Sequence, residues 1–260
     1  MESSWLGKNL RISTKICCPG QIYLCKMGLV LFFLGNEVFM NAVLVPPIFK
    51  LDGLDQRIVI SGVSPETHQR LLEDLGDQPV PRVTYWKGVL QLMSPTSQHE
   101  QLIELLCEVV KIHARYHKQR IVGTRSMTLE KKGVDGSAQP DASFYIKQAA
   151  QVARTIKIDL AVDPPPDLII EIDITSSSAQ KIQTDGLYSQ LGIPEIWRYE
   201  LRSGFEMYLL QKSRYEVISA SENLPGLMSE MICQVIAKFE SEGQLAALEW
   251  FESTLESNHG

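Results

Sequence analysis

The fold is decided by residues 167–174, which read Asp-Leu-Ile-Ile-Glu-Ile-Asp-Ile. Aliphatic side chains fill most of these positions, which is typical of a strand buried on both faces of a sheet. Side chains alternate along a strand, so Glu171 and Asp173 share one face, opposite Ile170 and Ile172. Buried carboxylates cost free energy unless a cation or hydrogen bonds compensate them. The stretch therefore predicts a central strand whose acids have a chemical role.

The elements around this strand predict an α/β (α+β) fold with a mixed central sheet flanked by helices. Before it we expect a helix from Ser64 to Gly76, a long helix from residue 97 to beyond residue 112, and strands over residues 83–85, 89–93, 121–129 and 142–146. After it we expect a helix from residues 176–178 to Gly192, strands over residues 195–199, 207–210 and 215–218, and one or two helices within residues 227–255.

Composition limits the class of protein. The chain has 260 residues and a formal net charge of −6, so it is not a polycation that coats nucleic acid. Its five cysteines form neither a zinc-ribbon pattern nor a disulfide framework, which favours a reducing, cytoplasmic location. We divide the chain into an unstructured or spurious extension over residues 1–45, one domain over 46–225, and a C-terminal helical extension over 226–260.

The N-terminal segment differs in character from the rest of the chain. Basic residues precede an apolar run over residues 27–34, which is too short to span a bilayer. A poor signal peptide is one interpretation, and a true start at Met40 or Met27 is the interpretation we favour. We therefore expect residues 1–39 to be dispensable for stability and solubility, and we expect no membrane association.

A third acid stands at the start of another predicted strand. Pro140 and Asp141 come directly before the strand over residues 142–146. Carboxylates with water are the ligands that Mg²⁺ or Mn²⁺ prefers, so Asp141 and Glu171 are candidate metal ligands on neighbouring strands. The alternative is structural: Asp141 caps a turn and Asp173 lies at an exposed strand end.

The order of these motifs resembles the PD-(D/E)XK nuclease superfamily, and most closely its Uma-two family of restriction-endonuclease-like proteins. Pro140-Asp141 precedes Glu171 by thirty positions, as in that superfamily. The resemblance covers roughly residues 46–220. Its other motifs are Gly88-Val89-Leu90, Met93-Ser94-Pro95, His99-Glu100, Pro165-Pro166-Asp167-Leu168, Lys181, Tyr188 and the segment from Leu191 to Tyr199.

The resemblance implies a restriction-endonuclease-like core and a metal-dependent reaction. Asp141 and Glu171 would bind Mg²⁺ or Mn²⁺, and Glu100 would contribute to the metal site or its water shell. The superfamily has a lysine two positions after the glutamate, where this chain has Asp173. Lys181, early in the following helix, is the candidate substitute. Glu100 also follows Ser97 by three positions, which matches a capping box at a helix start.

A basic segment is the candidate surface for DNA. Residues 111–132 hold seven lysines and arginines against the single acid Glu130. An ordinary solvated helix end and loop explains the same charges equally well. The leading hypothesis is a Mg²⁺-dependent DNA endonuclease, and a homodimer is compatible with it. The alternatives are a nuclease-like scaffold that binds DNA or a protein without cutting, and an acidic structural protein.

Overall fold

The computed structural model describes residues 55–76, 81–155, 158–174 and 178–257, together with two short strands nearer the N-terminus. These strands, β1 (Tyr23–Leu24) and β2 (Val30–Leu31), form an antiparallel pair. The chain divides into two compact units, Met1–Asp52 and Gly53–Gly260. Our expectations for residues 1–45 otherwise lie outside the described residues. All that follows concerns the second unit.

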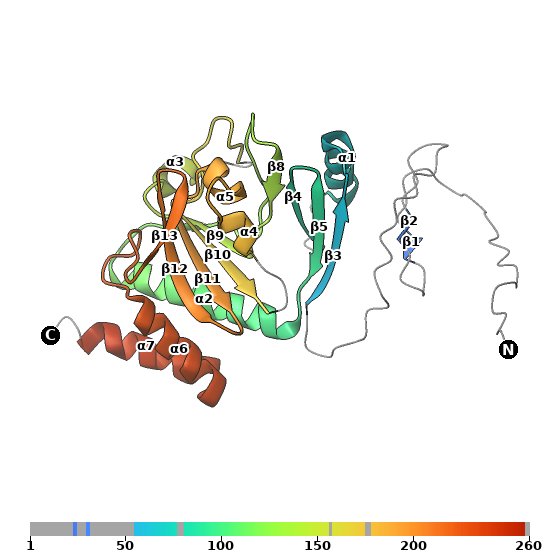
Figure 1. The fold of residues 1–260 in the computed structure, drawn as a ribbon. Helices are drawn as coiled ribbons and strands as arrows, with labels where there is room; N and C mark the ends of the chain where they lie inside the picture. Colours follow the sequence, from blue (N-terminus) through green and yellow to red (C-terminus); the bar gives the residue numbers. More distant parts are fainter. Residues whose placement is uncertain are drawn as a thin grey trace, which may run out of the picture. The chain divides into compact units, whose positions relative to one another are not determined.

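A six-stranded mixed sheet is built around the acidic strand β10 (Leu168–Asp173) (Figure 1). Strand β10 pairs in parallel with β11 (Glu195–Glu200) and antiparallel with β9 (Ala142–Tyr145), and every one of its residues is buried. The remaining strands extend the sheet on both sides, and they are β12 (Gly204–Gln211), β13 (Arg214–Ile218) and β6 (Val122–Gly123). The predicted central strand and mixed sheet are confirmed.

A second, five-stranded antiparallel sheet was not predicted. The strands predicted over residues 83–85 and 89–93 are present as β4 (Arg82–Trp86) and β5 (Val89–Ser94), and they pair with each other. They join three further strands rather than the central sheet, namely β3 (Gln56–Ser61), β7 (Leu129–Glu130) and β8 (Gly136–Ala138). The strand predicted over residues 121–129 is wrong as a single strand, because its two ends, β6 and β7, belong to different sheets. The chain turns between them at Arg125, which has a φ of 48°.

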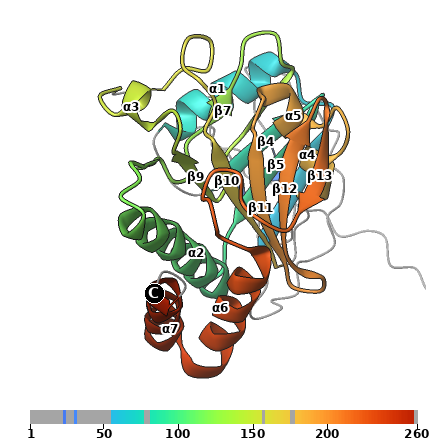
Figure 2. The same cartoon turned by 90° about the vertical axis from the view of Figure 1, so that its left-hand side faces the viewer.

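Helices cover the outer faces of both sheets. The long helix α2 (Ser97–Tyr116) packs its apolar side onto the six-stranded sheet, together with α6 (Ser229–Glu242) and α7 (Gln244–Ser257) (Figure 2). The core there includes Ile170 and Ile172 of β10, with Val235 and Phe251 from the last two helices. The C-terminal helices therefore share the main core. Helix α1 (Pro65–Leu75) packs on the five-stranded sheet.

Two predicted helix details are wrong. The side chain of Thr96, rather than that of Ser97, caps α2 by accepting from the backbone N–H of His99, so Glu100 takes no part in a capping box. The helix predicted from residue 176 to Gly192 is two short helices, α4 (Ala179–Ile182) and α5 (Leu187–Leu191). The break follows from Asp185, whose φ is 54°, and from Gly186 after it.

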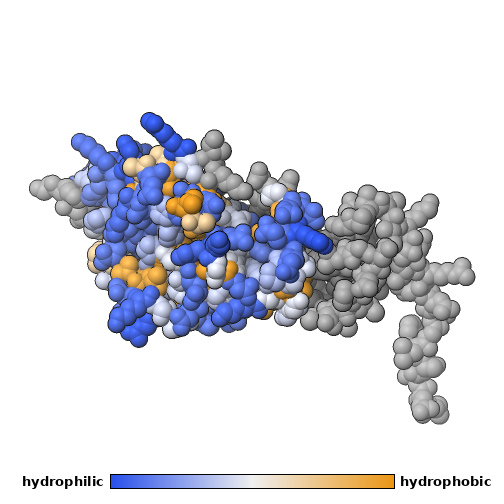
Figure 3. All heavy atoms as spheres, turned by 90° about the horizontal axis from the view of Figure 1, so that it is seen from above, coloured by the Kyte–Doolittle hydropathy of each residue, from blue (hydrophilic) through white to orange (hydrophobic). Residues whose placement is uncertain are grey.

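One face of this unit is largely polar. Figure 3 shows hydrophilic residues over most of the face seen from above, with apolar residues in separate patches. Short helix α3 (Ala149–Val152) completes the described elements of the unit. Within the described part of the chain, none of the helices has the length and apolar character needed to cross a membrane.

Candidate active site

A narrow pocket lies between the two sheets, and the predicted acids line it. Asp141, Glu171 and Asp173 come from the start of β9 and from β10, and Lys181 comes from α4. The five-stranded sheet contributes four further lining residues, which are Arg82 and Thr84 of β4 with Gln91 and Met93 of β5. The acidic strand is therefore covered by the second sheet at the level of its acids.

Asp141 is held by contacts from three directions. Ala142, the next residue, pairs with Ile170, so Asp141 lies at the edge of β10 beside Glu171. One carboxylate oxygen, Oδ2, accepts the backbone N–H of Ile172 at 2.6 Å, and the other, Oδ1, accepts from the Arg82 guanidinium. Burial alone would raise the pKa of Asp141, but His99 and Arg82 hold that pKa below its ordinary value. Asp141 is thus a buried carboxylate that stays ionised.

His99 joins two buried acids behind the pocket. Its Nδ1 lies 2.9 Å from Asp55 Oδ2, and its Nε2 lies 3.1 Å from Asp141 Oδ1. Burial lowers the pKa of His99, but the hydrogen bonds to the two carboxylates outweigh burial and raise the pKa to about 9. Contacts at both of its ring nitrogens allow His99 to fix the position of Asp141 relative to Asp55.

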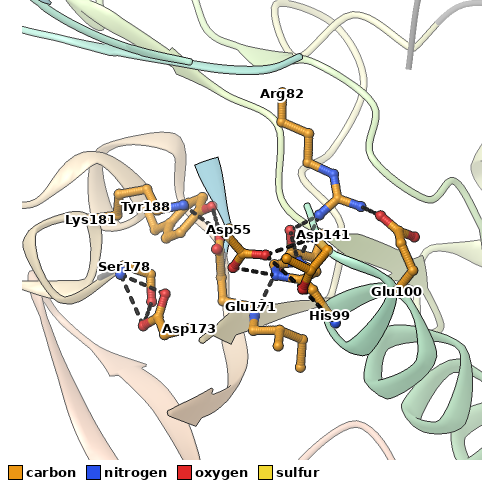
Figure 4. Close-up of polar contacts among 12 residues, drawn as sticks. Asp55, Arg82, His99, Glu100, Asp141, Glu171, Asp173, Ser178, Lys181 and Tyr188 are labelled. Atoms are coloured by element: carbon orange, nitrogen blue, oxygen red, sulfur yellow. Dashed lines mark hydrogen bonds and ion pairs between the residues drawn. The ribbon is translucent and has the colours of Figure 1, made fainter. Parts of the chain in front are cut away.

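Glu171 is bonded by the predicted lysine. Lys181 Nζ donates to Glu171 Oε1 at 2.6 Å, and the buried Tyr188 hydroxyl donates to the same oxygen (Figure 4). Burial raises the pKa of Glu171, Asp141 and Asp173 raise it further, and Lys181 opposes them. Burial is therefore the main reason that the pKa of Glu171 is raised.

Asp173 stands where the superfamily pattern has its lysine, and it has partners of its own. Arg198 Nε donates to Asp173 Oδ2 at 2.7 Å, and the backbone N–H of Ser178 donates to Oδ1 at 2.9 Å. The Ser178 hydroxyl donates to Oδ2 as well, at 2.9 Å. Asp173 thereby ties the start of α4 to β10 and helps to place Lys181. The two acids have separate cationic partners, because Lys181 pairs with Glu171 and Arg198 pairs with Asp173.

Glu100 lies at the rim and faces an arginine. Its Oε1 accepts from Arg82 Nη2 at 2.7 Å, and its side chain is 45% exposed. Figure 4 shows Arg82 between Glu100 and Asp141. Among the described residues, no group of three or more His, Cys, Asp or Glu side chains is arranged to hold a metal ion. Glu100 as a third ligand therefore stays a prediction.

Asp141 and Glu171 by themselves fit a divalent cation. Both carboxylates line one pocket, and their mutual repulsion contributes to the raised pKa of Glu171. Mg²⁺ is commonly held by one or two protein carboxylates, with water and substrate phosphate oxygens completing its shell. Because the Arg82 guanidinium occupies Asp141 Oδ1, a metal at that oxygen requires Arg82 to turn toward Glu100.

The basic segment over residues 111–132 does not line this pocket. Lys111 follows Glu100 by eleven residues on α2, about 16 Å along the helix axis. Three of the seven basic residues pair with acids: Lys111 with Glu108 at 2.7 Å, Arg115 with Glu252 at 2.6 Å, and Arg125 with Glu104 at 3.6 Å. These pairs favour the interpretation of the segment as an ordinary solvated helix end.

Sequence reasoning found Lys181, but it missed Asp55, Arg82 and Arg198 and gave His99 no role in holding the acids. Arg82 is on β4 of the five-stranded sheet, and Asp55 directly precedes β3 of the same sheet. No local sequence pattern indicates how this sheet lies against β10. Arg198 did have a signal. It lies between the buried residues Trp197 and Tyr199, and the parallel pairing of β11 places it beside Glu171.

Comparison with known proteins identifies the family. A family model described as "Putative restriction endonuclease" (Uma2) matches residues 65–237, more than half of the chain, so the chain belongs to the Uma2 family. A solved structure titled a putative nuclease belonging to DUF820, from Anabaena variabilis ATCC 29413, is 21% identical with a TM-score of 0.44. That match covers 61% of this chain and 91% of the other. No curated protein gives a significant match.

Proposed function

We propose that the protein is a divalent-metal-dependent endonuclease that hydrolyses phosphodiester bonds in DNA. One observation carries the proposal: Asp141 and Glu171 line the same pocket from neighbouring strands, and Lys181 bonds to Glu171. Membership of a family described as restriction endonucleases supports the same reaction class and a DNA substrate.

In this proposal Asp141 and Glu171 would hold a Mg²⁺ or Mn²⁺ ion, and that ion would supply activation of water and charge neutralisation at the phosphate. Lys181, as an ammonium group 2.6 Å from Glu171, orients the attacking water and stabilises negative charge that develops on the phosphate oxygens. The Tyr188 hydroxyl donates to the same oxygen of Glu171 and helps to fix its rotamer.

The residues around Asp141 act on position and charge. His99 holds Oδ1 of the Asp141 carboxylate, and the backbone N–H of Ile172 holds Oδ2. Arg82 compensates the charge of Asp141 and also bonds to Glu100. If Asp141 binds a metal ion, Glu100 remains as a carboxylate partner for Arg82. We place Glu100 at the edge of the water shell rather than in direct contact with the metal.

A second candidate function is a DNA-binding scaffold that does not cut. Two observations favour it: Asp173 replaces the lysine of the superfamily pattern, and the Arg82 guanidinium occupies Asp141. In that case DNA binding persists and hydrolysis is absent.

Plasmid cleavage separates the two functions. Supercoiled plasmid is incubated with the wild-type protein in Mg²⁺ or Mn²⁺, and gel electrophoresis follows nicked and linear product. We expect cleavage by the wild type and a loss of at least 100-fold in Glu171→Gln, because the variant removes a metal-binding charge. Glu73→Gln, on the exposed side of α1, is the matched control and should cut normally. DNA binding without cleavage by the wild type would contradict the nuclease and support the scaffold.

A further inference from the structure

One face of the five-stranded sheet continues outward from the pocket. Strand pairing places Arg57, Met93 and Arg82 in one row across β3, β5 and β4. The next row consists of Val59, Gln91 and Thr84. Residues directly opposite each other in a sheet point to the same face, so both rows share the face that lines the pocket.

Arg57 stands at the open end of the first row. Strand β3 is at the edge of the sheet, and Gln56, Val59 and Ser61 on it are exposed. Two strand spacings, about 10 Å, separate Arg57 from Arg82, whose guanidinium contacts the acid Asp141. Arg57 therefore lies between the pocket and the exposed edge of the five-stranded sheet.

Arg57 differs from the other cations near the pocket by its lack of a partner. Arg82, Lys181 and Arg198 each form an ion pair with an acid. The ion pairs among the described residues include none to Arg57, and its Nε is buried without a hydrogen-bond partner. Burial lowers the pKa of Arg57 and the charge of Asp173 partly opposes this effect, so the cation is incompletely compensated within the protein.

An unpaired, half-buried guanidinium is suited to bind an anion from outside the chain. The planar fork of arginine binds two phosphate oxygens at once, which an ammonium group cannot do. A DNA strand that enters this pocket must also pass acids, in a protein whose net charge is −6. A cation on the approach offsets that repulsion.

We propose that Arg57 binds a backbone phosphate of the DNA next to the cleaved bond, and that the strand runs along the β3–β5–β4 face past Gln91 and Thr84. This inference rests on the proposed function, because it takes DNA as the substrate. It places the DNA-binding surface beside the pocket, rather than on the basic segment over residues 111–132.

The test measures binding without catalysis. A fluorescein-labelled 20-base-pair duplex is titrated with full-length protein, once in EDTA and once in Ca²⁺, and anisotropy gives Kd over a range of salt concentrations. Arg57→Ala should weaken binding about tenfold and reduce the slope of log Kd against log salt by about one. Arg57→Lys should fall between the alanine variant and the wild type, because it keeps the charge and loses the fork.

Arg70→Ala is the matched control. Arg70 is exposed on α1, which packs on the opposite face of the same sheet, so the same loss of charge there should leave Kd and the salt slope unchanged. Thermal unfolding of Arg57→Ala should match or exceed that of the wild type, since the variant removes a buried N–H without a partner.

The outcomes separate this inference from the proposed nuclease activity. If the wild type binds DNA and Arg57→Ala binds it equally well with the same salt slope, Arg57 is not a phosphate ligand. If the wild type leaves the duplex free in both EDTA and Ca²⁺, DNA as the substrate is wrong, and the inference is wrong with it. If Arg57→Ala weakens DNA binding, Arg70→Ala does not, and the wild type never cleaves DNA, then Arg57 is supported as a phosphate ligand. Only the proposed nuclease activity is then contradicted.

Discussion

Lys181 contacts Glu171 from helix α4. In the PD-(D/E)XK pattern, by contrast, the lysine lies on the same strand as the glutamate. Asp173 occupies that strand position and uses it to anchor Ser178, which starts the turn leading to Lys181. Asp173, at the position where the pattern has its lysine, therefore helps to place Lys181.

We expect Lys181→Ala to abolish cleavage and Lys181→Arg to restore only part of it, because a planar guanidinium does not match a compact ammonium. Both variants should keep the fold, measured by circular dichroism and thermal unfolding. Lys147→Ala, an exposed lysine after β9, controls for the loss of one positive charge. Normal cleavage by Lys181→Ala would show that another group orients the water.

His99 is expected to matter for stability as well as for the site. His99→Ala leaves the buried carboxylates of Asp55 and Asp141 without their shared partner, which should reduce the free energy of unfolding by about 3 kcal/mol. Urea unfolding followed by fluorescence measures this loss. Gln101→Ala, at an exposed position on the same helix, should change the value by less than about 0.5 kcal/mol. Equal effects of the two variants would mean that the bridge between the acids is not formed.

Among the elements, the break between α4 and α5 sets the position of Lys181. A Cβ atom on Gly186 would lie 2.7 Å from the carbonyl oxygens of Gln183 and Lys181, too close for any other residue without movement of α4. Gly186→Ala should therefore lower stability by about 1–3 kcal/mol and reduce cleavage through displacement of Lys181. Asp185→Gly is the control, because glycine readily adopts the φ of 54° found there. If Gly186→Ala has the stability and the cleavage activity of the wild type, then this turn does not constrain α4.

Elements with a strong local pattern could be predicted from the sequence, and elements defined by distant partners could not. The aliphatic run of β10 predicted its buried position, and the alternation of its side chains predicted that Glu171 and Asp173 share a face. The strand predicted over residues 121–129 was wrong, because β6 and β7 are two residues long and are stabilised by partners in different sheets. The pairing of Arg82 with Asp141 spans 59 positions and joins two sheets, so no local pattern records it.

At the scale of the whole molecule, the C-terminal helices belong to the folded unit. Phe251 is fully buried in the main core with residues of α2 and β10. Removal of residues 227–260 would expose that core, so we expect the shortened chain to aggregate or to bind the dye ANS. Phe251→Ala, by comparison, should remain soluble and lose about 3–5 kcal/mol of stability. A shortened chain that is soluble and unfolds at the wild-type temperature would show that these helices are a separate extension.

The central claim is that Asp141 and Glu171 together bind one divalent ion, and Mn²⁺ titration tests it without relying on catalysis. Electron paramagnetic resonance counts free Mn²⁺ as wild-type protein, Asp141→Asn, Glu171→Gln and Glu100→Gln are added in turn. We predict one Mn²⁺ per chain for the wild type, strongly weakened binding in both the Asp141 and Glu171 variants, and a smaller effect of Glu100→Gln. A wild type that leaves all Mn²⁺ free, or Asp141 and Glu171 variants that bind as well as the wild type, would contradict the account.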